Sequence, residues 1–184
     1  MSSVHFRKAA RALRAGGVIA YPTEAVWGLG TDPWNERACE RLLAMKDRSW
    51  DKGLILVASS AEQLAPFIEV PSNAVWKRAA LTWPGPNTWV FPCREETPMW
   101  ISGDHDTIAV RISAHETVRA LCERFGGAVV STSANPAGRE PALSATQARL
   151  YFGDELDYVL PGALGGLSKP TSIRDAQTGH ILRR

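Results

Sequence analysis

Hydrophobic residues recur at helical spacing in several parts of the chain. Phe6, Ala9 and Leu13 fall on one face of a helix that the glycine pair at 16–17 would end. Three serines are followed by Gln or Glu three positions later, which is the pattern of a capping box. Together these signals predict further helices that begin at Asn35, Ser60, Ser72, Ser113 and Ser144.

Short apolar runs between these helices read as strands. They cover residues 18–22, 54–58, 87–92, 107–112, 128–133, 171–175 and 180–184. No helix separates 87–92 from 107–112, so the strands do not alternate strictly with helices. The pattern predicts a single α/β domain over residues 1–184, with a mixed β-sheet covered by helices. The chain is too short and too irregular for an eight-stranded barrel.

Composition narrows the class of protein. The 184 residues carry a formal net charge of only +2, which does not favour nucleic-acid binding by charge alone. Cys39, Cys93 and Cys122 are scattered and form no Cys-x-x-Cys pair, as is typical of a reducing cytosol. The sequence shows neither a signal peptide nor a run of about 20 apolar residues, so we expect a cytoplasmic protein without a membrane partner.

Several common catalytic motifs are missing. The sequence has no G-x-x-x-x-G-K-[ST] phosphate loop, no G-x-G-x-x-G fingerprint and no G-x-S-x-G elbow. The histidines are not spaced as zinc ligands, and "GDHD" at 103–106 is more typical of an exposed turn than of a metal site. Ser131 and Ser133 have no obvious histidine partner, which disfavours a nucleophilic serine.

Polar side chains instead gather at the ends of predicted strands. The strand at 128–130 runs into Ser131, Thr132, Ser133 and Asn135, which is more hydroxyl and amide than a turn requires. Thr23 also follows a strand, although a threonine there often only bonds its own turn. These groups indicate a surface that holds something polar.

Cationic side chains accompany them. Lys46, Arg48 and Lys52 lie in a loop that leads into a buried strand, and loops at strand ends hold ligands in open sheets. Arg111 lies within an apolar strand, where it is either on a solvated face or a clamp for a carboxylate. The charged residues of the loop and of the basic chain end at 183–184 could likewise simply be exposed to solvent, without binding a ligand. Taken together, the cations and hydroxyls favour binding of anions and transfer of a phosphoryl or nucleotidyl group.

Five segments, in this order, resemble the YrdC-like family in its short bacterial, TsaC-type form. They are "VIAYPTEA", the K-x-R loop that continues into "KGLILVA", "WPGPNTWVFP", "AVRIS" and "VVSTSANPAG", and the closing "PTSIRDAQTGHILRR" is also similar. The resemblance spans nearly the whole chain. It implies a twisted mixed sheet flanked by helices around a basic concave cleft.

The resemblance also implies an activity. Members of this kind are nucleotidyltransferases that use L-threonine, bicarbonate and ATP with Mg²⁺ to form threonylcarbamoyl-adenylate and pyrophosphate. The adenylate feeds a downstream threonylcarbamoyl transferase complex that makes t6A37 in tRNA. Some members bind RNA in the cleft, so tRNA or double-stranded RNA is a possible further partner.

Matching the motifs residue by residue implies the site. Lys46 and Arg48 stand at the K-x-R positions, which face the ATP phosphates and are the catalytic candidates. The implied ATP site comprises Lys46, Arg48, Lys52, Ser133, Asn135, Pro141 and Arg183. The implied threonine site comprises Thr23, Arg111, Ser131 and Thr171.

Two departures from the family pattern stand out. Many relatives read K-P-L where this chain has Lys52, Gly53 and Leu54, and glycine would leave the loop's backbone less fixed. The chain ends at Arg184, so we expect it to lack the C-terminal domain of longer relatives and any lid which that domain supplies.

Two other functions remain as hypotheses. One is an RNA-binding module without catalysis, based on the basic loop, on Arg183 and Arg184, and on seven tryptophans available for stacking. However, Trp27, Trp83 and Trp89 lie in apolar segments and are more simply core or pocket wall. The other is carbamoyl-adenylate chemistry on a different amine.

Overall fold

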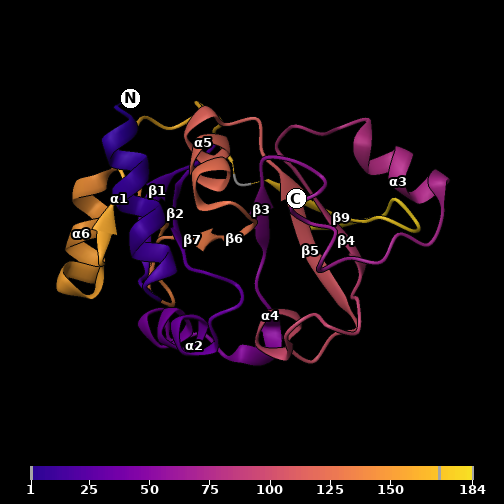
Figure 1. The fold of residues 1–184 in the computed structure, drawn as a ribbon, viewed down its shortest axis with the longest axis horizontal. Coiled ribbons are helices and arrows are strands. Elements are labelled where there is room, and N and C mark those ends of the chain that lie inside the picture. Colours follow the sequence, from indigo (N-terminus) through magenta and orange to yellow (C-terminus); the bar gives the residue numbers. More distant parts are fainter. Residues whose placement is uncertain (1, 170, 184) are drawn as a thin grey trace.

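Two mixed β-sheets form the centre of the computed structural model, which describes residues 2–169 and 171–183 (Figure 1). The helices are α1 (Ser3–Arg14), α2 (Glu36–Met45), α3 (Asn73–Ala80), α4 (Met99–Ser102), α5 (Glu116–Phe125) and α6 (Ala145–Phe152). Two 3₁₀ turns, η1 (Trp50–Lys52) and η2 (Gly153–Glu155), come after α2 and α6. None of the helices in the described part of the chain has the length and apolar character needed to span a membrane.

The four-stranded sheet has the order β7-β2-β1-β8, and the six-stranded sheet has the order β10-β9-β4-β5-β3-β6. Their strands are β1 (Ile19–Pro22), β2 (Trp27–Gly30), β3 (Leu56–Ala58), β4 (Asn87–Pro92), β5 (Thr107–Ile112), β6 (Val129–Val130), β7 (Thr132–Ser133), β8 (Tyr158–Val159), β9 (Ser172–Asp175) and β10 (Ile181–Arg183). Each sheet contains parallel and antiparallel pairs, for example β3 parallel to β5 and β4 antiparallel to β5. The predicted α/β class with mixed strand directions and flanking helices is confirmed, although the structure has two sheets where the sequence predicted one.

The single strand predicted over 128–133 is wrong. β6 pairs with β3 in the six-stranded sheet, whereas β7 pairs with β2 in the four-stranded sheet. Ser131 lies between them, and its N–H donates to the carbonyl of Ile55 at 2.8 Å. The chain therefore crosses from one sheet to the other at the first of the hydroxyl residues.

The capping signals were partly right. Asn35, Ser72 and Ser144 each accept a hydrogen bond from a backbone N–H in the first turn of α2, α3 and α6. The helix predicted from Ser60 is wrong, because residues 61–67 form only turns and Pro66 has no N–H with which to continue a helix.

The helix predicted from Ser113 begins later than expected. His115 is the N-cap residue of α5. The hydroxyl of Ser113 instead donates to Oε1 of Glu24 at 2.7 Å and accepts the N–H of His115 at 3.1 Å. The serine that the capping-box pattern assigned to the helix therefore makes a tertiary hydrogen bond to Glu24 instead.

Gly30 in β2 allows the two sheets to approach closely. A Cβ at this position would lie 2.5 Å from the carbonyl oxygen of Val130 and 2.8 Å from the ring of Tyr21. We expect Gly30→Ala to lower the free energy of unfolding by about 1–3 kcal/mol, because overpacking forces neighbours apart. Urea unfolding measures the change. Gly127→Ala is the matched control, since a Cβ there meets only the Phe125 ring at 3.8 Å and beyond; equal stabilities of the two variants would contradict the prediction.

Candidate active site

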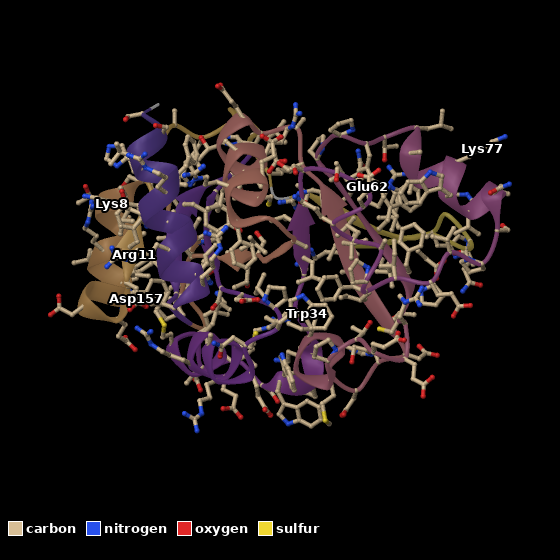
Figure 2. All side chains as sticks on the ribbon, viewed as in Figure 1. Lys8, Arg11, Trp34, Glu62, Lys77 and Asp157 are labelled. Carbon is tan, nitrogen blue, oxygen red and sulfur yellow. The ribbon has the colours of Figure 1, made fainter. Side chains whose placement is uncertain are left out.

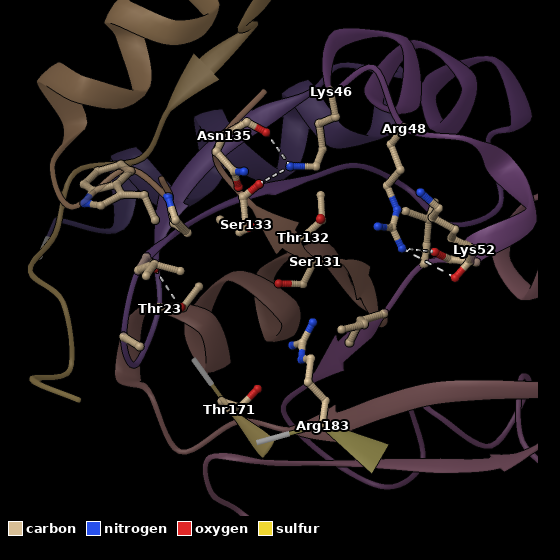
Figure 3. A pocket seen from close by; sticks show the side chains of 18 of the residues that line it. Thr23, Lys46, Arg48, Lys52, Ser131, Thr132, Ser133, Asn135, Thr171 and Arg183 are labelled. Carbon is tan, nitrogen blue, oxygen red and sulfur yellow. Dashed lines mark hydrogen bonds between the residues drawn. The ribbon is translucent and has the colours of Figure 1, made fainter. Parts of the chain in front are cut away.

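A cavity of about 470 Å³ lies where the two sheets meet (Figure 3). Its walls come from the β1–β2 turn, the loop after α2, β5, the β6–β7 crossover and its following loop, and the C-terminal strands. This volume is within the usual range for small-ligand sites. Five separate parts of the chain therefore build one hollow.

Every side chain that the sequence assigned to a ligand lines this cavity. The implied threonine set is present as Thr23, Arg111, Ser131 and Thr171. The implied ATP set is present as Lys46, Arg48, Lys52, Ser133, Asn135, Pro141 and Arg183. The roles of these residues stay predictions, but their common location satisfies the geometric condition for a single site.

The sequence did not single out other wall residues. Trp27, Leu54 and Ile55 add apolar surface, and Thr132 adds a further hydroxyl. Asp47 is the one carboxylate residue on the wall among the described residues, and it has a positive φ of 48°. Thr132 could have been found from the unbroken run of hydroxyls, whereas Asp47 gave no signal beyond its place between Lys46 and Arg48.

Lys46 braces the loop that follows β7. Its buried ammonium group donates to the carbonyl of Ser133 and, at 2.7 Å, to the carbonyl of Asn135 (Figure 3). Its own carbonyl accepts the N–H of Ala137 at 3.0 Å. The side chain that the sequence assigned to the ATP phosphates thus also fixes the backbone of the S-x-S-x-N segment. Burial, followed by the nearby charge of Arg48, lowers the pKa of Lys46 to about 8.

The arginines crowd one another. Burial lowers the pKa of Arg48, and the charge of Arg183 lowers it further. Burial also lowers the pKa of Arg183, and the charge of Arg111 lowers it further. An anion that enters the cavity would relieve this repulsion, so the site is suited to a ligand with several negative charges.

Arg111 is buried at the side of the cavity. Its Nη2 lies 3.5 Å from Oε2 of Glu24, and its Nη1 donates to Oγ1 of Thr171 at 2.9 Å. Of the two positions that the sequence left open for this arginine, the cavity wall is the one observed, and the solvated face is excluded.

The remaining polar groups are partly engaged. The Thr23 hydroxyl donates to the carbonyl of Val26 at 2.7 Å, so it does bond its own turn while it lines the cavity. Asn135 donates through Nδ2 to the carbonyl of Arg139 at 2.8 Å. Its buried Oδ1 has no hydrogen-bond partner within the described residues.

Gly53 lies against the end of α4 in the basic loop. Its φ is +60°, and a Cβ would lie 2.7 Å from the carbonyl oxygen of Ser102. Its carbonyl accepts from Nη2 of Arg48 at 3.0 Å. Tight contact with the end of α4 therefore requires a residue without a side chain at this position, and the expectation of a less fixed backbone stays a prediction.

Nothing in the described structure forms a protein metal cage. No group of three or more His, Cys, Asp or Glu residues is arranged to hold an ion within residues 2–169 and 171–183. The "GDHD" turn is not such a group either.

The comparisons with known proteins agree with this architecture. The Sua5/YciO/YrdC family model, described as "Telomere recombination", matches residues 11–184. The threonylcarbamoyl-AMP synthase of Halorhodospira halophila is 54% identical over 179 residues, which are 97% of this chain and 93% of that protein. The threonylcarbamoyl-AMP synthase of Pseudomonas aeruginosa is 52% identical over 183 residues, which are 100% of this chain and 98% of that protein.

Solved structures show the same fold. P. abyssi Sua5 in complex with L-threonine superposes with a TM-score of 0.87 at 33% identity, over 92% of this chain and 50% of that chain. The chain thus spans about half the length of Sua5. E. coli YciO superposes with a TM-score of 0.88 at 23% identity, over 100% of this chain and 90% of that chain, which supports the fold alone.

The two mixed sheets and the cavity between them, lined by five cationic side chains, define a class of α/β proteins with a pocket at a sheet junction. Within that class, the family match and the full-length relatives are decisive: the chain belongs to the Sua5/YciO/YrdC family.

Proposed function

We propose that this protein is a threonylcarbamoyl-AMP synthase, which converts L-threonine, bicarbonate and ATP to threonylcarbamoyl-adenylate and pyrophosphate. The observation that carries the proposal is the convergence of the complete implied threonine and ATP sets on one cavity. Relatives that are 52–54% identical over nearly their whole length bear that name.

The two substrates are assigned to different groups of residues on the cavity wall. Arg111, with Thr171 beside it, offers a guanidinium to the carboxylate of L-threonine. Arg48, Lys52 and Arg183 provide the positive charge that a triphosphate requires. The amine of L-threonine first forms an N–C bond to the carbon of bicarbonate with loss of water, which gives an anionic carbamate. A carbamate oxygen then attacks the α-phosphorus, and the bond to pyrophosphate breaks with its electron pair on the leaving group.

The protein's contribution is alignment and charge neutralisation. Holding two reactants close together in the right orientation can lower the activation barrier by about 7–11 kcal/mol. No covalent enzyme intermediate is required. The neutral hydroxyls of Ser131 and Ser133 bind an anion without a tight ion pair that would retain the product.

Mg²⁺ enters this scheme with the nucleotide. Magnesium usually keeps several waters and is held by substrate phosphates with one or two carboxylates, and Asp47 is the wall carboxylate in the described structure that could contribute. When bound, the ion would neutralise charge on the departing pyrophosphate.

The wider biological setting is also a proposal. We infer a cytoplasmic protein whose product passes to a threonylcarbamoyl transferase complex for t6A formation in tRNA. Trp27 and Trp89 are only 3% and 2% exposed and cannot stack on an RNA base without rearrangement, whereas Trp34 and Trp50 are 50% and 45% exposed and keep the RNA-module hypothesis open. Arg184, part of the basic end in that hypothesis, lies outside the described residues.

A direct assay tests the proposed function. Protein is mixed with ATP, Mg²⁺, bicarbonate and L-threonine, and the adenylate is sought by mass spectrometry. Omission of L-threonine should abolish the product, and substitution by other amino acids tests the different-amine hypothesis. Tight tRNA binding without any adenylate would favour the RNA module and overturn the proposal.

The lowered pKa of Lys46 predicts a pH dependence. As pH rises through about 8 the ammonium loses its proton in the free protein, so kcat/KM for ATP should fall. The unfolded chain keeps that proton up to its ordinary value of 10.5, so the buried charge lowers stability below about pH 8, and the free energy of unfolding rises with pH between these two values. In Lys46→Arg the side chain no longer titrates, and the fall near pH 8 should disappear; identical profiles for the two proteins would contradict the assignment.

A further inference from the structure

Glu24 follows the cavity residue Thr23, but its own side chain is not part of the cavity wall. It is buried, and its Oε2 lies 3.5 Å from Nη2 of Arg111, which does line the cavity. Within the described residues, this is the one ion pair made by any cation of the cavity wall. Glu24 therefore contacts the guanidinium from behind the site.

The carboxylate of Glu24 is itself held in place. Its Oε1 accepts from the Ser113 hydroxyl at 2.7 Å, and that hydroxyl accepts the N–H of His115 at the start of α5. The carbonyl of Glu24 accepts the N–H of Leu167 at 3.0 Å. A Cβ on Gly165 would lie 3.0 Å from the Cα of Glu24, so this glycine lets the segment at 163–167 lie directly against it. Side chain and backbone are fixed by different parts of the chain.

The other half of the guanidinium is held by hydroxyls. Nη1 of Arg111 donates to Oγ1 of Thr171 at 2.9 Å and to Oγ1 of the buried Thr88 at 3.4 Å. Glu24 is thus the described partner of Nη2, and without it that end of the planar group has no charged contact. A guanidinium recognises a carboxylate best when its plane is fixed beforehand.

We propose that Glu24 is a positioning residue that orients Arg111 for the carboxylate of the amino-acid substrate. This inference rests on the proposed function, since it assumes that Arg111 binds L-threonine. Glu24 acts through Arg111 and has no role in nucleotide binding, so its effect is confined to the amino acid.

Glu24→Gln tests the inference, because it removes the charge and keeps the size. Calorimetric titration with L-threonine and steady-state kinetics are compared with those of the unaltered protein. We expect the Kd and KM for L-threonine to rise about ten-fold. A factor of this size is within the range of coupling energies measured between residues in direct contact. The KM for ATP and kcat should change by less than about two-fold, a split that a general loss of stability would not produce.

Three further variants separate positioning from folding. Glu24→Asp keeps the charge and should recover part of the lost affinity. Ser113→Ala leaves the charge of Glu24 in place but removes the hydrogen bond that holds its carboxylate. The Kd and KM for L-threonine should therefore rise, by a smaller factor than in Glu24→Gln. This variant also tests the inference if Glu24→Gln fails to fold. Ser72→Ala removes the N-cap of the distant α3 and should lower stability while leaving both substrate constants unchanged.

The outcomes are distinguishable. Unchanged or tighter L-threonine binding by Glu24→Gln would overturn the positioning role and leave the proposed function standing. Equal losses of affinity for ATP and for L-threonine would have the same consequence. If the unaltered protein bound no L-threonine and formed no adenylate, the proposed function would fail and the inference with it.

Discussion

Lys46→Ala is expected to lower turnover by on the order of 10²-fold, as is typical for loss of one preorganised electrostatic group. The ammonium group holds the carbonyls of Ser133 and Asn135 and adds positive charge to the cavity. Its removal both frees the loop and weakens the field at the phosphates. Pyrophosphate release under saturating substrates measures the effect, and circular dichroism establishes that the variant is folded.

Two variants give this prediction its controls. Lys46→Met keeps most of the chain length without the charge and should be as inactive as the alanine variant. Lys77→Ala removes an exposed lysine from the outer side of α3, away from the cavity, and should keep full turnover (Figure 2). Undiminished pyrophosphate release by Lys46→Ala would remove Lys46 from the mechanism.

Arg111→Ala is expected to affect stability and activity together. Removing one member of a buried ion pair leaves the other charge uncompensated, which typically costs about 3–5 kcal/mol. Glu24 would be left in that state, because its charged partner in the described structure is Arg111. Threonine-dependent adenylate formation should fall by at least on the order of 10²-fold, since the carboxylate loses its guanidinium.

A double variant separates the two effects. Adding Glu24→Gln to Arg111→Ala removes the stranded charge, so urea unfolding should show partial recovery of stability without recovery of activity. Arg183→Ala is the comparison for stability: this arginine makes no ion pair within the described residues, so its loss leaves no stranded charge and should reduce activity with little change in the unfolding free energy. A double variant no more stable than Arg111→Ala would contradict the stranded-charge explanation.

Local sequence rules succeeded where the signal and the structure are both local. Ser144 caps α6 because its hydroxyl and the N–H of Gln147 are three residues apart, and nothing else competes for them. The same rule failed at Ser113, where Glu24 lies 89 residues away in sequence and takes the hydroxyl. The strand β2 was missed because glycine at 28 and 30 breaks the apolar pattern, although the sheet junction requires Gly30.

The members of the site were predicted through motifs, and their contacts were not. Motif matching supplied Lys46 and Arg111 as ligands of anions, and both line the cavity. It did not indicate that Lys46 also holds two carbonyls of the opposite loop, or that Arg111 depends on Glu24. The extent of the domain, residues 1–184, stays a prediction from sequence.

The sequence by itself determined most of the segments that become helices and strands, the α/β class with mixed strand directions, and the kinds of side chain available for an anionic ligand. These properties follow from hydrophobic periodicity and residue chemistry within short windows of chain. Only the tertiary structure decided that β6 and β7 belong to different sheets, that the polar strand ends meet in one cavity, and that the buried Arg111 is paired with Glu24 behind the cavity wall. Such contacts depend on the packing of segments distant in sequence, which no local pattern encodes.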